Sequence, residues 1–201
     1  MLPARSVPPG ILAAIVAGGF LIGADFSRPD TAGFALGKTT EQEIRQRFGA
    51  PNSEATAQVG NQPVTILRYT HSEVASGLVA ARAMVYTFHG GRLVGFDYSS
   101  SFAGDQTVID ESALKRIRPR ETTRAGALAL VGKPTGQFIY PSPYVTMPGR
   151  RVDLYSYARS ERAASGATLE EISRVLAITF DERDVVVETS LVTTSTSKAL
   201  Q

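Results

Sequence analysis

Hydrophobic and polar residues alternate with a period of two in several stretches of this chain. In AMVYTFHGGRLVGFDYSS, Val85 and Thr87 alternate with Tyr86 and Phe88, and β-branched and aromatic residues dominate. This pattern is typical of β-strands. Similar stretches are VTILRYT, RVDLYSYAR and RVLAITFDERDVVVETSLV. The polar turns HGG after Phe88 and DERD after Phe180 predict hairpins between antiparallel strands.

A helix pattern precedes each group of strands. Thr40 is a good N-cap, and Glu43 three residues later completes a capping box. Ile44 and Phe48 lie four residues apart, so a short helix would carry one apolar stripe. Gly49 suits the end of that helix, and the proline two residues later prevents its continuation. The sequence therefore predicts a short capped helix before the first strands.

This helix-and-strands pattern occurs twice. TTEQEIRQRFGAP aligns without gaps to TTRAGALALVGKP, and the match continues downstream with growing offsets, as loop insertions would produce. The matched pairs include Thr40/Thr123, Gly49/Gly132, Tyr69/Tyr157 and Phe88/Phe180. We expect an α+β fold of two tandem units, each with short helices packed on one face of a three- or four-stranded antiparallel sheet. The units span residues 31–105 and 106–192, between an N-terminal hydrophobic helix in residues 1–30 and a polar tail in residues 193–201.

The repeated unit resembles the small envelope domain of the BamE family, also called SmpA/OmlA. The resemblance rests on short motifs in both copies: Gly37, Thr39, Glu43, Phe48, Gly49, Pro51, Tyr69 and Phe88 in the first, and Thr122, Val131, Gly132, Pro134, Tyr157 and Phe180 in the second. It implies short helices on an antiparallel sheet and a non-enzymatic role as an accessory or assembly factor. A tandem pair of similar units is also known in the β-lactamase inhibitor protein, which binds through the concave face of its sheet.

The N-terminal segment carries a localisation signal. After Arg5, residues 11–24 are uncharged and mostly apolar, with Ile11, Leu12, Ile15, Val16, Phe20, Leu21 and Ile22 as the membrane-facing candidates. Such a segment suits a single-pass inner-membrane anchor with the body of the protein in the periplasm. The alternative is a secretory signal that is cleaved after Ala24, which would release a soluble periplasmic protein.

Composition and motifs argue against several kinds of chemistry. The formal net charge is +2, so there is no electrostatic case for nucleic acid, and no cysteine is present. Gly37-Lys38-Thr39 resembles the end of a phosphate-binding loop, but Ala32 stands where the motif requires glycine. We therefore expect no nucleotide, no metal and no other cofactor. His71 and His89 are expected in exposed loops, and a hydrolase would require one of them beside a carboxylate in a pocket.

The segment FIYPSPYVTMPGRR is the candidate protein contact. It combines three prolines with side chains that are common at interfaces, namely Tyr140, Tyr144, Met147, Arg150 and Arg151. The alternative is that its first residues form a strand bordered by prolines. The sequence thus predicts a non-enzymatic envelope protein that is an accessory or scaffold subunit of a membrane or envelope protein complex. The alternatives are a periplasmic inhibitor, a chaperone-like binding protein, or an outer-membrane protein assembly factor.

Overall fold

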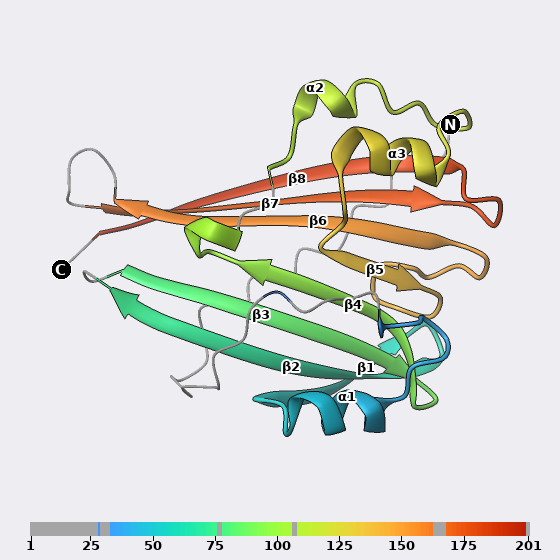
Figure 1. Ribbon diagram of the computed structural model, residues 1–201, viewed down its shortest axis with the longest axis horizontal. Coiled ribbons are helices and arrows are strands. Elements are labelled where there is room, and N and C mark those ends of the chain that lie inside the picture. The colour runs from blue at the N-terminus through green and yellow to red at the C-terminus, as the bar shows by residue number, and fades with distance from the viewer. Residues whose placement is uncertain (1–27, 29–32, 76–77, 106–107, 163–167, 200–201) are drawn as a thin grey trace.

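The computed structural model describes residues 28, 33–75, 78–105, 108–162 and 168–199 (Figure 1). The predicted membrane segment, residues 11–24, lies outside this part of the chain. Within it, no helix is long and apolar enough to cross a membrane. The prediction of a single-pass inner-membrane protein with an N-terminal helix therefore has no support in the structure, and we do not retain it.

In the described part of the chain, eight strands form one antiparallel sheet, and each strand pairs with its neighbours in sequence order. They are β1 (Ser53–Val59), β2 (Gln62–Ala75), β3 (Leu78–His89), β4 (Arg92–Ser100), β5 (Gly136–Ile139), β6 (Arg151–Arg162), β7 (Thr168–Phe180) and β8 (Val186–Ala199). The helical segments are α1 (Glu41–Phe48), η3 (Ala103–Asp105), α2 (Glu111–Leu114) and α3 (Arg124–Val131). Most of the residues that the sequence assigned to a polar tail extend β8.

The helix ends follow the predicted local chemistry. The Thr40 hydroxyl accepts from the backbone N–H of Glu43 at 3.2 Å, and the Glu43 carboxylate accepts from the N–H of Thr40 at 2.6 Å, which confirms the capping box. Thr123 caps α3 in the same way, through the N–H of Gly126. The C-cap residue Gly49 has a φ of 78°, in the region that favours glycine.

The two halves of the sheet join where β4 pairs with β5. Gly95 lies opposite Phe138, and Asp97 lies opposite Gly136. The predicted fold class, two tandem units that each have a sheet of three or four strands, is therefore wrong, because the described chain forms a single eight-stranded sheet. Whether the two units share one sheet was a question that the sequence left open. Periodicity identifies strands but not the edge with which each will pair. The four residues of β5 pair with β4 on one side and with β6 on the other, and so join the two halves. From the sequence, a strand in this segment was only the alternative expectation.

Several local contacts recur in the two halves. Tyr69 donates its hydroxyl hydrogen to the carbonyl oxygen of Gly49 at 3.0 Å, and Tyr155 makes the same contact with Gly132. Sequence alignment instead matched Tyr69 with Tyr157. Side chains of a strand alternate between the two faces, so a shift of two positions leaves the hydrophobic pattern unchanged. Only the contact to the helix end distinguishes the two tyrosines.

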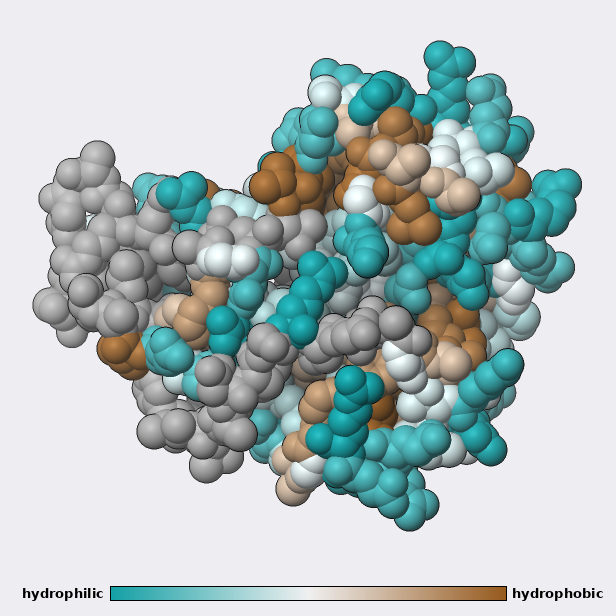
Figure 2. All heavy atoms as spheres, viewed as in Figure 1, coloured by the Kyte–Doolittle hydropathy of each residue, from teal (hydrophilic) through white to brown (hydrophobic). Residues whose placement is uncertain are grey.

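The helices lie on the same face of the sheet, with α1 over one half and α3 over the other (Figure 1). Beneath α1 is a core of Phe34, Ile44, Leu67, Tyr69, Met84, Tyr86, Phe88, Leu93, Phe96 and Tyr98. Beneath α2 and α3 is a core of Ile109, Ile117, Ala127, Tyr155, Leu176, Ile178, Phe180 and Val186. Figure 2 shows apolar side chains gathered around these helices and polar side chains along the rim.

A third apolar cluster lies on the opposite face of the sheet. It consists of Phe138, Val145, Val152, Leu154 and Val175. The register explains its position, since Phe138 and Leu154 follow Gln137 and Asp153, which share the helix-covered face with Phe96. Both faces of the sheet are therefore covered in its second half.

Candidate functional site

The loop between β5 and β6 folds back over the sheet face opposite the helices. Ser142 and Val145 exchange two backbone hydrogen bonds, of 3.1 and 3.0 Å, which close a tight turn. This turn buries Val145 in the third cluster and places the Tyr144 ring 4.6 Å from the Phe138 ring, centroid to centroid. Burial raises the pKa of the Tyr144 hydroxyl above its ordinary value. Tyr144, one of the five candidate contact residues, thus packs inward between the loop and the sheet.

The other four candidate residues lie at or beside the surface. Met147 is 60% exposed, and Arg150 and Arg151 are partly exposed. Tyr140 packs its ring against the third cluster and also borders an open groove. The sequence therefore identified side chains that the fold divides between the interior and the surface.

The groove has a volume of about 450 Å³. One wall comes from the ends of the loop, with Ile139, Tyr140, Pro148, Gly149, Arg150 and Arg151; the other comes from the turn between β7 and β8, with Asp181, Glu182 and Asp184. Two cations thus face three carboxylates. Arg151 Nη1 lies 3.4 Å from Asp184 Oδ1, whereas Arg150 makes no ion pair within the described residues.

Asp181 organises the second wall of the groove. Its Oδ1 accepts from the backbone N–H of Arg183 at 2.9 Å and of Val185 at 3.0 Å. The hydrogen bond from Val185 is the main cause that lowers the pKa of the Asp181 carboxyl. Asp181 therefore stabilises the turn, and Glu182 projects from the position that follows it.

Gly149 permits the close approach of the two walls. Its φ is 74°, and a Cβ atom there would lie 2.1 Å from Glu182 Oε1. A side chain at this position would therefore be strained in its backbone and would displace Glu182. The sequence placed the three carboxylates in a hairpin turn but did not predict that Gly149 would approach them, because this contact joins two segments that are distant along the chain.

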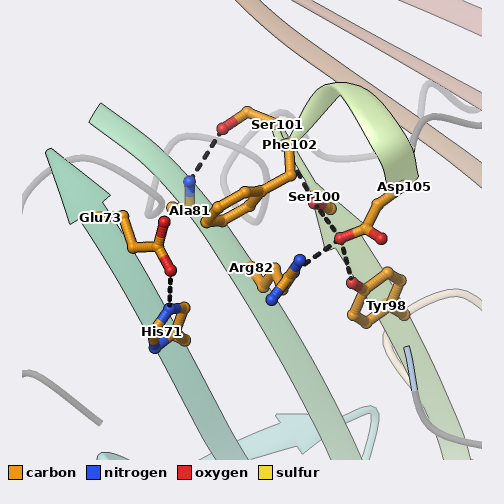
Figure 3. Close-up of polar contacts among 9 residues, drawn as sticks. All are labelled: His71, Glu73, Ala81, Arg82, Tyr98, Ser100, Ser101, Phe102 and Asp105. Atoms are coloured by element: carbon orange, nitrogen blue, oxygen red, sulfur yellow. Dashed lines mark hydrogen bonds and ion pairs between the residues drawn. The ribbon is translucent and has the colours of Figure 1, made fainter. Parts of the chain in front are cut away.

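A separate polar network lies at the far end of the sheet's first half (Figure 3). Asp105 of η3 accepts from Arg82 Nε at 2.6 Å, from the Tyr98 hydroxyl at 2.9 Å and from the Ser100 hydroxyl at 3.0 Å. Burial opposes ionisation of Asp105, but the three hydrogen bonds outweigh it and lower the pKa of its carboxyl. The network fastens η3 to β3 and β4.

The structure places both histidines in strands, so the expectation of exposed loop histidines is wrong. His71 is buried in β2, its Nε2 lies 3.1 Å from Glu73 Oε1, and its ring stacks on that of Phe102. His89 ends β3, and its Nδ1 lies 2.9 Å from the Pro63 carbonyl oxygen. Figure 3 shows His71 and Glu73 directed toward each other and away from Asp105.

The described residues contain no group of three histidines or carboxylates placed to hold a metal ion. Tyr140, Arg150 and Arg151 of the groove instead belong to residue types that are enriched at protein interfaces. Of the features above, the groove is the one that combines open access with an anchored loop.

Comparison with known proteins gives little further information. A scan against protein-family models and a search of curated proteins give no match. Among solved structures, the fold is similar to a Streptococcus mutans protein described as a "putative beta-lactamase inhibitor protein". The identity is 13% and the TM-score 0.44, over 81% of this chain and 87% of that one. At this level the likeness carries no argument about function, and the resemblance to the BamE family gains no support.

Proposed function

We propose that this chain is a protein-binding module whose partner docks at the groove between residues 139–151 and the turn at residues 181–184. The observation that carries the proposal is the arrangement of Tyr140 and Arg150 in the groove beside the exposed Met147. Tyrosine, arginine and methionine are enriched at protein interfaces. The partner that fits is a protein segment with a carboxylate for Arg150 and an apolar side chain for Met147.

The loop is held in place before binding. The Ser142–Val145 turn and the packing of Tyr144 on Phe138 fix its conformation from beneath. A loop that is already ordered loses less conformational entropy when a partner binds, which favours affinity. Of the functions that the sequence analysis considered, an inhibitor-like or chaperone-like binding protein is the one that this proposal retains.

Photo-crosslinking from the loop tests the proposal. A photoreactive amino acid in place of Met147 should give one dominant adduct in cells of the source organism. The matched control carries the same group in place of Thr56, which is exposed on β1. Arg150→Glu should remove the adduct at position 147 without changing the thermal midpoint. Identical adducts from both positions, or an adduct that is indifferent to Arg150→Glu, would show that the groove is not the binding site.

A further inference from the structure

β8 forms one edge of the sheet, and only the start of its outer edge is paired. Val186 accepts from the N–H of Arg120 at 2.7 Å and donates to the carbonyl of Thr122 at 2.8 Å. Beyond Val186, no described residue pairs with this edge. The side chains of residues 187–197 are exposed, apart from the partly buried Ser190. In the part of the chain that the structure describes, a long row of main-chain donors and acceptors is thus left open.

The corresponding edge in the first half of the sheet is occupied. Leu93 of β4 accepts from the N–H of Gly37 at 2.7 Å and donates to the carbonyl of Thr39 at 2.8 Å, so residues 37–39 cap this end of the β4 edge. Residues 120–122 cap the start of the β8 edge at Val186 in the same way. Immediately beyond the cap on β4, this strand pairs with β5, starting at Gly95. β8 repeats the cap, but no described residue forms a strand in the place of β5. The molecule itself shows that this type of edge accepts an antiparallel strand.

The sequence of β8 does not protect its edge. Exposed edge strands usually carry proline, several lysines or a bulge that prevents pairing with another chain. β8 reads VVETSLVTTSTSKA, with no proline or glycine, and its only charged residues are Glu188 and Lys198. Its register shift lies at Val187, at the start of the strand, and β4 has the same shift at Val94 and still pairs with β5. Val187, Leu191 and Val192 are among the exposed large apolar residues of the described chain. These features favour pairing rather than prevent it.

We propose that β8 pairs antiparallel with β8 of a second copy, about a two-fold axis at Thr193. Thr193 is the midpoint of the open stretch, residues 187–199. In this register, the position of Glu188 lies opposite the position of Lys198 in the other copy. An acidic and a basic position therefore face each other at both ends of the paired stretch. Opposite charges at facing positions stabilise a strand pair, whereas facing like charges destabilise it.

The main-chain geometry is consistent with this register. Residues at equal distances from Thr193 face each other, so the two members of a pair are an even number of positions apart in the sequence. Residues with this spacing direct their N–H and C=O groups toward the same edge of the strand. Pairing of the whole open stretch would form about 12 main-chain hydrogen bonds. A two-fold contact uses the same edge on both copies, so the association closes at a dimer. The proposal is independent of the groove.

Single cysteines test the register, because the chain has none of its own. Thr193→Cys would place two thiols opposite each other across the axis, so a mild oxidant should convert the full chain to a disulfide-linked dimer. Ser195→Cys is the matched control, since it is equally exposed but would lie opposite Leu191 of the other copy. Equal cross-linking of both variants, or none for Thr193→Cys, would overturn the proposal.

Charge reversal provides a second test by analytical ultracentrifugation. The unmodified chain should sediment as a dimer. Glu188→Lys should shift it toward monomer, and the double variant Glu188→Lys/Lys198→Glu should restore the dimer. Glu182→Lys, in the exposed turn before β8, is the control and should leave the dimer unchanged. A monomer at every soluble concentration, an open series of larger species, or a dimer indifferent to Glu188→Lys would each refute the pairing.

Discussion

Ser156 donates its hydroxyl hydrogen to the carboxylate of Asp97, with oxygen–oxygen distances of 3.2 and 3.1 Å to its two acceptor atoms. The contact joins β6 to β4 where the short strand β5 begins. Thr135 donates to the same carboxylate at 3.1 Å. Burial raises the pKa of Asp97 to about 6, although these hydrogen bonds oppose the rise. The seam between the two halves of the sheet therefore contains a titratable group.

The first prediction concerns pH. Because the pKa of Asp97 is higher in the folded chain than in the unfolded chain, the folded state binds its proton more tightly. This contribution to stability is complete below about pH 4 and is lost as the pH rises through about 6. Asp97→Asn should remove that loss and stabilise the fold at pH 8 by on the order of 2 kcal/mol. Urea unfolding at pH 4 and pH 8 measures both effects.

The amide oxygen that Asp97→Asn introduces can still accept the hydrogen bonds from Ser156 and Thr135, so the variant isolates the charge. Ser156→Ala is the control, because it removes a donor and should destabilise the charged form at pH 8 more than the neutral form at pH 4. An Asp97→Asn variant that is less stable than the parent at pH 8 would contradict the assignment.

The second prediction compares two neighbouring tyrosines, whose rings lie 5.9 Å apart. The hydroxyl of Tyr86 is buried without a hydrogen-bond partner among the described residues. Tyr86→Phe removes an unsatisfied polar group, so it should leave stability unchanged or raise it by up to about 1 kcal/mol. Tyr69→Phe loses the bond to Gly49 and should cost about 1 kcal/mol. Urea unfolding of the two variants checks the difference, and equal losses would contradict it.

The third prediction concerns the β4–β5 seam. A Cβ atom on Gly95 would lie 1.9 Å from Cδ1 of Phe138, so Gly95→Ala should overpack the third cluster and cost about 1–3 kcal/mol. Phe138→Leu should also destabilise the fold, since it removes a buried ring. Because the leucine makes room for the new methyl group, the double variant should be more stable than the sum of the single losses predicts. Strictly additive losses in a double-mutant cycle would show that the two sites do not meet.

The fourth prediction separates the two roles of the loop. Tyr144→Ala removes a ring packed on Phe138 and should lower stability by about 3 kcal/mol. Met147→Ala, at a largely exposed position, should change stability by less than about 0.5 kcal/mol but should weaken partner binding. Calorimetric melting of both variants gives the stability difference. A large loss from Met147→Ala would mean that its side chain contributes to the core.

The local elements of this fold could be predicted from the sequence because short-range chemistry decides them. The Thr40–Glu43 capping box and the Gly90–Gly91 turn each depend on residues within a few positions of one another. Parts of β2, β3, β4, β6, β7 and β8 were likewise visible in their period-two pattern, whereas β1 was not predicted. The loop was recognisable by composition, but composition did not show that Tyr144 would pack inward and Met147 outward.

Long-range packing decided the rest. The edge of β4 could have stayed open, as most of the β8 edge does among the described residues, and only the approach of β5 makes the two halves one sheet. The same limit explains why Tyr155, and not Tyr157, is the counterpart of Tyr69, and why His71 is buried. Sequence periodicity by itself determined α1, α3 and much of the longer strands, because each of these patterns follows from one segment's own geometry. The tertiary structure determined which edges pair and which side chains meet at the groove, because those contacts join segments that no local pattern connects.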